Sequence, residues 1–387
     1  MTEVGIFLFG HGMNPYQIDT YGWQLHQLHT KKAPFSFFFT GRTLEAMKKN
    51  ELVREKIREM FPENVSAKNP YDSEIGVSSW NHFPVVPLDL ELESWGIYLE
   101  SFVNKEIENS KRILWYDYGK NARGFFPPEL LFAKAAGYYL RRHWIDYAIV
   151  DGSMLNPWEK GQVFHSPDGL KLVPRHNWIR TLGHPQETVN DILNFTHNCG
   201  AKSIVLGYDF DYNNYGIPYY QGVAYHCKLA DILYRTGGIE LRNIASIADS
   251  ASTIPYPMDH HYTTSWIDCE KGLTFLCHPK VNKRNGIVND VIRNYGRLKT
   301  RLEAVKVRIE NERLGENIQE WYRNISNDLE NARISFCSFA GGMEYRHPVW
   351  VNEESMSRTF YGTTSYSMEN LGNIDQSLHG LEQHVFH

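Results

Sequence analysis

The chain has 387 residues, of which 42% are hydrophobic and 22% are charged, and its formal net charge is −5. This composition is typical of a globular protein that is large enough for one big domain or two ordinary ones. The slightly negative charge argues against a basic surface for nucleic acid or an anionic membrane, so we expect neither as a partner. The sequence leaves the oligomeric state open.

The N-terminal segment and the cysteines bear on the cellular compartment. The apolar run near the N-terminus is short, follows no basic region and precedes no small-residue cleavage site. It therefore indicates a first strand and not a signal peptide. The five cysteines are odd in number and contain no Cys-x-x-Cys pair, which favours a reduced compartment. No apolar stretch is long enough to span a membrane, so we expect a cytoplasmic protein.

Strand and helix signals alternate along the first two-thirds of the chain. Continuous apolar runs, typical of strands buried on both faces, indicate strands at residues 4–9, 35–41, 146–152 and 203–209. Amphipathic stretches predict helices at residues 43–61, 128–142, 185–200 and 222–238. Residues 112–118 have a pattern typical of a strand or a loop. Residues 239–249 have a pattern typical of a strand followed by a short helix. The alternation predicts an α/β fold whose largely parallel sheet is closed or nearly closed as a barrel.

The pattern changes near residue 284, which we take as the end of the barrel domain (1–283). Residues 286–312 and 317–339 have the pattern of two long helices with charged exposed faces, so residues 284–345 are expected to form a helical subdomain packed on the barrel. The remaining residues, 346–387, are rich in Ser, Gly, Thr and Asn and show little periodicity, which predicts an irregular tail.

Chemically active side chains lie at or just past the predicted strands. His11 follows the first strand, Glu74 and His82 are eight residues apart, and Asp209 and Asp211 follow an apolar strand. The carboxyl ends of parallel strands meet on one face of a barrel, so residues far apart in the chain are expected to share a pocket there.

Glu129 adds a further carboxylate within the segment "GFFPPELL". Pro127 and Pro128 cannot continue a sheet ladder, but they can end a strand and begin a helix, which puts Glu129 at a strand-to-helix junction. Two carboxylates on either side of a scissile bond are the minimal equipment for glycoside hydrolysis.

Five segments, in the same order, resemble the motifs of glycoside hydrolase family 57. "FLFGHGMNP" resembles a strand ending in His-Gln-Pro, with His11 in the His place and Gly12 in the Gln place. "SEIGVSSWNHFPVVPL" is similar to a segment in which Glu is followed eight residues later by His and then by a "PILPL"-like run, and Glu74 and His82 match those places.

The other three segments complete the resemblance, which covers roughly residues 3–340. "GFFPPELLFAKAAGYYLRRHWIDYAIVDG" resembles a Gly-x-Trp-x-Pro-Glu motif, in which Glu129 falls on the family's nucleophile and Phe126 replaces the Trp. "YDFDYNNYG" is similar to Asp-x-Glu-x-Phe-Gly, with Asp209 in the acid/base place and Asp211 replacing the Glu. "TTSWIDCEKG", which contains Trp266, resembles a Ser-Trp-x-x-Cys/His segment.

The resemblance implies an incomplete parallel (β/α)₇ barrel followed by a helical region, and a retaining glycoside hydrolase or transglycosylase for α-linked oligo- or polysaccharides. In that reaction Glu129 is the nucleophile and Asp209 is the general acid/base, and neither a metal nor a cofactor takes part. The residues expected to contact the sugar are His11, Glu74, His82, Trp80, Phe126, Asp211 and Trp266.

Two other functions stay open. A metal-dependent polysaccharide deacetylase would need an Asp and two His as ligands. Candidates are Asp259, His260 and His261, together with the two aspartates of "YDFDYNNYG". However, we find no His-x-x-x-His-like spacing of the kind the deacetylases use. The second alternative is a carbohydrate-binding homologue without catalysis, because three of the motif positions depart from the family's residues.

Overall fold

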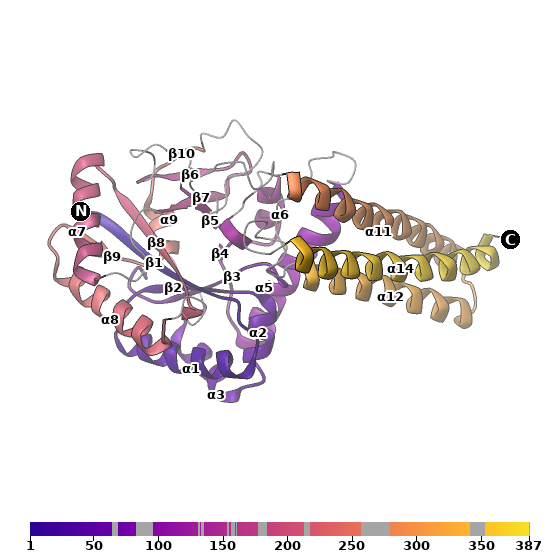
Figure 1. Cartoon of the computed structure of the whole chain (residues 1–387), viewed down its shortest axis with the longest axis horizontal. Coiled ribbons are helices and arrows are strands. Elements are labelled where there is room, and N and C mark those ends of the chain that lie inside the picture. The colour runs from indigo at the N-terminus through magenta and orange to yellow at the C-terminus, as the bar shows by residue number, and fades with distance from the viewer. Residues whose placement is uncertain are drawn as a thin grey trace. The chain divides into compact units, whose positions relative to one another are not determined.

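The computed structural model (Figure 1) describes residues 1–63, 69–82, 96–130, 132, 135–152, 155, 159, 161–176, 184–212, 217–256, 279–340 and 353–386. Of residues 129, 279–289, 338–340 and 353–365 it describes the backbone alone. The chain divides into two compact units, which are Met1–Val86 with Asn104–Gly272, and Pro87–Val103 with Leu273–His387. The sequence placed the division near residue 284 and did not assign residues 87–103 to the helical part.

The first unit is built on a sheet whose neighbouring strands are mostly parallel. Seven parallel strands follow one another in the order β7-β5-β4-β3-β2-β1-β8. Their bounds are β1 Thr2–Gly10, β2 Phe35–Phe39, β3 Glu74–Val77, β4 Gly124–Phe125, β5 Tyr147–Asp151, β7 Lys171–Arg175 and β8 Ser203–Asp209. Three short strands extend the sheet: β6 (Val163–His165) beside β7, β10 (Thr253–Pro255) beside β6, and β9 (Ile239–Leu241) beside β1.

His176 joins the two ends of this row of seven strands. Its backbone N–H donates to the Val205 carbonyl oxygen at 2.9 Å, and the Val205 N–H donates to Nδ1 of His176 at 3.1 Å. His176 directly follows β7, and Val205 lies in β8, so the row curves round into a barrel. The predicted α/β fold with an incomplete parallel (β/α)₇ barrel is therefore confirmed.

Large apolar side chains fill the barrel. The strands contribute Phe7, Phe9, Phe38, Tyr147, Ile149, Val173 and Val205 to one buried cluster. The short helix α9 (Ile244–Ser250) adds Ile244, Ala245, Ile247 and Ala248 to the same cluster. Because the interior is packed with side chains, chemistry in such a barrel belongs at the carboxyl edge of its strands.

Helices surround the barrel. Their bounds are α1 Pro15–Thr30, α2 Gly41–Met47, α3 Glu51–Met60, α5 Asn104–Tyr118, α6 Ala136–Arg142, α7 Pro185–Cys199 and α8 Tyr219–Arg235. Helices α8, α1 and α3 lie side by side outside the strands (Figure 1).

Two predicted helices and one predicted strand or loop differ from the structure. The helix expected at 43–61 is two helices, because the Asn50 side chain accepts the Val53 N–H and caps a new start. Residues 112–118, expected as strand or loop, form the end of α5. The helix expected at 128–142 is a 3₁₀ turn at Pro128–Leu130 followed by α6 from Ala136.

The second unit is helical. Its long helices α11 (Pro279–Glu312), α12 (Glu316–Ala340) and α14 (Glu353–Phe386) pack against one another as a bundle, and a short π-helix spans Tyr98–Val103. The first two were predicted, but α14 occupies most of the expected irregular tail. Its buried side chains recur every three or four residues, at Leu371, Ile374, Leu378, Leu381 and Val385. Within the described parts of the chain, none of the helices combines the length and apolar character needed to cross a bilayer.

Candidate active site

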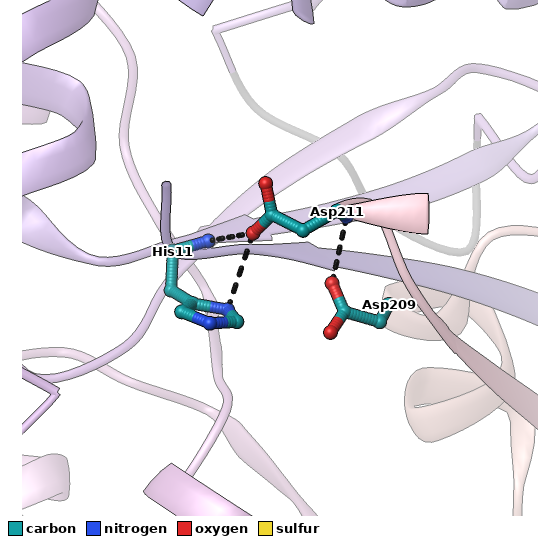
Figure 2. A group of neighbouring side chains, drawn as sticks. All are labelled: His11, Asp209 and Asp211. Atoms are coloured by element: carbon teal, nitrogen blue, oxygen red, sulfur yellow. Dashed lines mark hydrogen bonds and ion pairs between the residues drawn. The ribbon is translucent and has the colours of Figure 1, made fainter. Parts of the chain in front are cut away.

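The carboxyl ends of β1 and β8 bring three predicted residues together. Phe9 of β1 is paired with Asp209, the last residue of β8, and the Phe210 N–H donates to the Phe9 carbonyl oxygen at 2.7 Å. His11 follows β1 directly, and Asp211 lies two residues beyond Asp209. The three side chains consequently form one cluster at this edge of the barrel (Figure 2).

The Asp211 carboxylate is the most enclosed member of the cluster, with 2% of its side chain exposed. Its Oδ2 accepts the backbone N–H groups of His11 and Gly12 at 3.1 and 3.2 Å. Its Oδ1 accepts the Gln17 amide at 3.3 Å and the Tyr21 hydroxyl. A buried carboxylate needs such donors, because losing water without replacement is costly. Asp211 is thus held by the protein, which differs from the sugar contact expected from the sequence.

His11 lies beside Asp211 and is more accessible. Its Nδ1 lies 3.3 Å from Oδ2 of Asp211, close enough for an ion pair when the imidazole is protonated, and 22% of its side chain is exposed. The ring is stacked on Phe9, with centroids 5.5 Å apart, and this packing restricts its orientation. His11 is therefore the member of this pair that a ligand can reach.

Asp209 is oriented by the backbone that follows it. Its Oδ1 accepts the Asp211 N–H at 2.7 Å (Figure 2). The residue is partly exposed, unlike Asp211. A carboxyl group that is partly exposed at the end of a barrel strand can exchange a proton with a molecule bound there.

His82 joins the cluster through its ring. The His82 ring stacks on His11 with centroids 5.4 Å apart and planes 12° apart, and on Phe9 at 5.1 Å. The Phe9 ring in turn stacks on Phe126 at 4.1 Å. His82 has a φ of 57°, a backbone conformation that is uncommon for a residue with a side chain. The structure thus brings His11, His82 and Phe126 together at one place.

The structure describes two of the aromatic residues expected to contact the sugar, Phe126 and Trp80, and both pack against other parts of the protein. Phe126 is 1% exposed and belongs to the barrel core, so its ring offers no face to a sugar. Trp80 is half-buried, and its indole covers Gly41 so closely that a Cβ there would collide with it. Its carbonyl oxygen also accepts the Arg42 N–H at 3.0 Å, which ties it to the start of α2.

Glu74 lies away from the cluster. It is the first residue of β3, so it lies toward the amino end of the strand, whereas His82 lies beyond the carboxyl end. Its carboxyl group accepts the Ala245 N–H of α9 at 2.7 Å and the Tyr147 hydroxyl. Burial raises the pKa of Glu74 to about 8, against which the Ala245 hydrogen bond acts. The structure therefore gives Glu74 a place in the barrel interior and does not bring it to His11.

The remaining predicted residues are described in part or not at all. Glu129 lies in the 3₁₀ turn Pro128–Leu130, which begins at the third residue after β4, and its backbone is therefore at the carboxyl edge of the barrel. The Leu130 N–H donates to the Pro127 carbonyl oxygen at 2.8 Å, and Leu130 has a φ of 58°. The Glu129 side chain lies outside the described residues, as do Trp266 and the candidate metal ligands Asp259, His260 and His261.

Two residues of the cluster were missed from the sequence, namely Gln17 and Tyr21 of α1. Burial, together with the negative charge of Asp211, raises the pKa of Tyr21 well above its usual value. The two positions are four residues apart on a helix that starts soon after β1, so they share the face turned toward the strand end. That spacing was the available signal, but Gln and Tyr are common on helices and carry no chemical signature of their own.

The cluster has the residue types of a cation site. One nitrogen of His11 and one oxygen each of Asp209 and Asp211 lie within 4.8 Å of one another. An ion bound by Asp211 would have to displace donors that already occupy both of its oxygens. The observed hydrogen bonds therefore favour a held carboxylate over a metal ligand.

Comparisons with known proteins place this geometry in a known fold. No family model matches the sequence, and no curated protein does. The structure is similar to the α-amylase AmyC from Thermotoga maritima, with a TM-score of 0.60 and 11% identity over 99% of this chain and 96% of that one. It is similar to a GH57-type branching enzyme from Pyrococcus horikoshii, with a TM-score of 0.60 and 12% identity over 99% and 96% of the two chains.

A third solved structure, the 4-α-glucanotransferase from Thermococcus litoralis, has a TM-score of 0.59 and 13% identity, over 95% of this chain and 59% of that one. At these identities the likeness establishes a shared fold. It agrees with the resemblance to glycoside hydrolase family 57 that the motifs carry, but a fold alone does not specify a reaction.

Proposed function

We propose that this chain is a retaining glycoside hydrolase or transglycosylase acting on α-linked oligo- or polysaccharides. The observation that carries the proposal is the accessible, oriented carboxyl group of Asp209 beside His11 at the carboxyl edge of the barrel. Glu129 follows β4 at the same edge. The similar structures named as an α-amylase, a branching enzyme and a 4-α-glucanotransferase support the same class of substrate.

The proposed reaction is a double displacement. The ionised carboxylate of Glu129 forms a bond to the anomeric carbon, the glycosidic C–O bond breaks, and Asp209 gives its proton to the departing oxygen. In the second step Asp209 takes a proton from water or from a sugar hydroxyl, whose oxygen attacks the anomeric carbon and releases Glu129. Retention of configuration requires the two carboxyl groups about 5–5.5 Å apart.

The histidines have a different role in this proposal. His11 is accessible and lies beside Asp211, so it is suited to hold a sugar hydroxyl in the glycone subsite. His82 stacks on the His11 ring and supports it there. Neither step requires a metal ion or an organic cofactor.

The first experiment combines substrate screening with exchange of the nucleophile. Purified protein is incubated with α-linked gluco- and galacto-oligosaccharides in the presence of a chelator, and the products are separated by chromatography. Glu129→Gln is tested beside Glu51→Gln, a matched change at an exposed position of α3. Shorter or redistributed sugars from the wild type and the control, but not from Glu129→Gln, support the proposal, and longer products indicate transfer.

Stereochemistry then identifies which carboxylate forms the covalent bond. With an activated substrate and added azide, Glu129→Ala is expected to form a glycosyl azide of inverted configuration, because azide attacks in place of the missing nucleophile. Asp209→Ala is expected to form the azide of retained configuration, because azide attacks the glycosyl-enzyme. Full activity of Glu129→Gln would remove Glu129 as the nucleophile, and binding without turnover in the wild type would favour a catalytically silent carbohydrate-binding protein.

A further inference from the structure

Helix α1 reaches the candidate active site through two side chains on one face. Gln17 and Tyr21 both donate to Oδ1 of Asp211. The other oxygen, Oδ2, accepts the two backbone N–H groups at the end of β1, those of His11 and Gly12. The hydrogen bonds to the buried carboxylate therefore come equally from a strand end and from a helix.

Gln17 occupies space that a side chain at position 12 would otherwise fill. A Cβ added to Gly12 would lie 2.5 Å from the Gln17 amide carbon. The Gln17 Oε1 accepts the N–H of Met13 at 3.2 Å and the side-chain amide of Asn14 at 2.6 Å, while its Nε2 donates to Asp211. Gln17 thus connects the N-terminal cap of α1 to the Asp211 carboxylate, and glycine at position 12 makes this possible.

Tyr21 lies one turn further along α1 and is held from two sides. Its hydroxyl donates to Asp211 and accepts the Gly12 N–H at 2.9 Å, and its ring stacks on Phe210 at 5.2 Å. The side chain is almost completely buried, with 1% of the residue exposed. A buried hydroxyl with both a fixed acceptor and a fixed donor has one orientation, so it specifies the position of the Asp211 oxygen that it contacts.

Asp211 in turn contacts two other groups of the site. Its carboxylate lies 3.3 Å from Nδ1 of His11, and its backbone N–H donates to Oδ1 of Asp209 at 2.7 Å. A displacement of Asp211 would therefore move the imidazole and the carboxyl group together. We propose that Gln17 and Tyr21 are positioning residues, which act through Asp211 to hold His11 and Asp209 in their working geometry. This inference rests on the proposed function, since it assigns how that site is held.

Kinetics of two variants tests the proposal. Tyr21→Phe and Gln17→Ala are expected to lower kcat roughly 10- to 100-fold with little change in KM, because the substrate still binds but the acid/base group is displaced. Tyr118→Phe is the matched control, because it removes another buried hydroxyl, which donates to the Leu44 carbonyl oxygen on α2. Equal kinetic losses in Tyr21→Phe and Tyr118→Phe would overturn the proposal, because the loss would then reflect stability alone.

A double-mutant cycle tests the relation between positions 12 and 17. Gly12→Ala is expected to lower kcat in the wild type, because the new methyl group collides with the Gln17 amide and displaces it. The loss of kcat is expected to be much smaller when Gln17→Ala is already present. Additive effects of the two substitutions on kcat would show that the position of Gln17 does not depend on the absence of a side chain at Gly12.

An NMR measurement tests the same unit without any turnover. Asp211 and the stacked ring of His82 lie against His11, and Tyr21 contacts Asp211. Tyr21→Phe is expected to shift the labelled ring signals of His11, because Asp211 loses one of its donors, and Tyr118→Phe is expected to leave those signals unchanged. Unchanged His11 signals in Tyr21→Phe would overturn the coupling, even if the protein proved to have no glycosidase activity. Shifted signals without turnover would retain the coupling and reject the proposed function.

Discussion

The Nδ1 atom of His11 lies 3.3 Å from the Oδ2 atom of Asp211, although 200 residues separate them in the chain. The contact exists because β1 and β8 are parallel neighbours and both end at this edge of the barrel. His11 is accessible and Asp211 is enclosed, so His11 is the residue of this pair that a ligand can reach. Asp209 lies beside both of them.

Asp209→Asn should separate the two halves of acid/base catalysis. Hydrolysis of an ordinary glycosidic bond is expected to fall about 10²- to 10⁴-fold, because the leaving oxygen no longer receives a proton. A substrate with a good aryl leaving group should lose much less activity in its first step. Initial rates on both substrates check this, with Asp191→Asn on α7 as the control. Equal losses on the two substrates would contradict the acid/base role.

Glu74 should make the stability of the protein depend on pH. Its folded-state pKa is about 8, whereas an unfolded Glu titrates near 4.3, so between these values the unfolded chain releases a proton that the folded protein retains. The free energy of unfolding should therefore fall as pH rises from about 5 to 8, by up to about 1.4 kcal/mol per pH unit from this group.

Glu74→Gln should flatten that dependence, because the amide stays neutral at every pH. Denaturant titrations at pH 5, 6, 7 and 8 measure the difference, with Glu55→Gln at a surface position as the control. The same slope in wild type and Glu74→Gln would show that Glu74 is already ionised in the folded protein near pH 5.

Metal removal should leave the activity unchanged. The four donors on Asp211 occupy both of its oxygens, so a divalent ion gains little by replacing them. Dialysis against a chelator, followed by an assay and a measurement of bound metal, checks this outcome. Activity that disappears on dialysis and returns with one divalent ion would instead support the deacetylase alternative.

Helix α14 should contribute to the stability of the helical unit. Leu378 is fully buried in its apolar stripe, and Leu378→Ala should lower the free energy of unfolding by about 2–5 kcal/mol, through lost burial and the cavity left behind. Gln376→Ala, at an exposed position of the same helix, should have little effect. Calorimetry distinguishes the two variants, and equal stability would show that α14 is not packed through this face.

The sequence predicted the elements whose signals are local. Apolar runs marked β1, β2, β5 and β8, because strands covered on both faces are apolar throughout. It failed at α5, where a short window looked like a strand while the buried residues Ile107, Ile113 and Leu114 follow a helical spacing over a longer stretch. It failed at α14, because the many Ser, Gly, Thr and Asn residues there suggested an irregular segment, although apolar residues recur at a helical spacing.

The site was predicted residue by residue but not as an arrangement. Strand ends selected His11, Asp209 and Asp211, which lie together in the structure, and they also selected Glu74, which does not join them. Only the direction of β3 shows that Glu74 lies toward the other end of the strand, against Tyr147 and α9. Cytoplasmic location stays a prediction from the sequence.

The sequence by itself determined the α/β repeat and the side chains that follow its strands, because hydrophobic periodicity and strand ends are local features of a sequence. Only the tertiary structure decided which of these side chains is accessible and which is enclosed. Asp211 turns toward Gln17 and Tyr21 because α1 packs beside the end of β8 and supplies donors there. A buried carboxylate needs hydrogen-bond donors close to it, and which donors are close depends on how segments far apart in the sequence pack together.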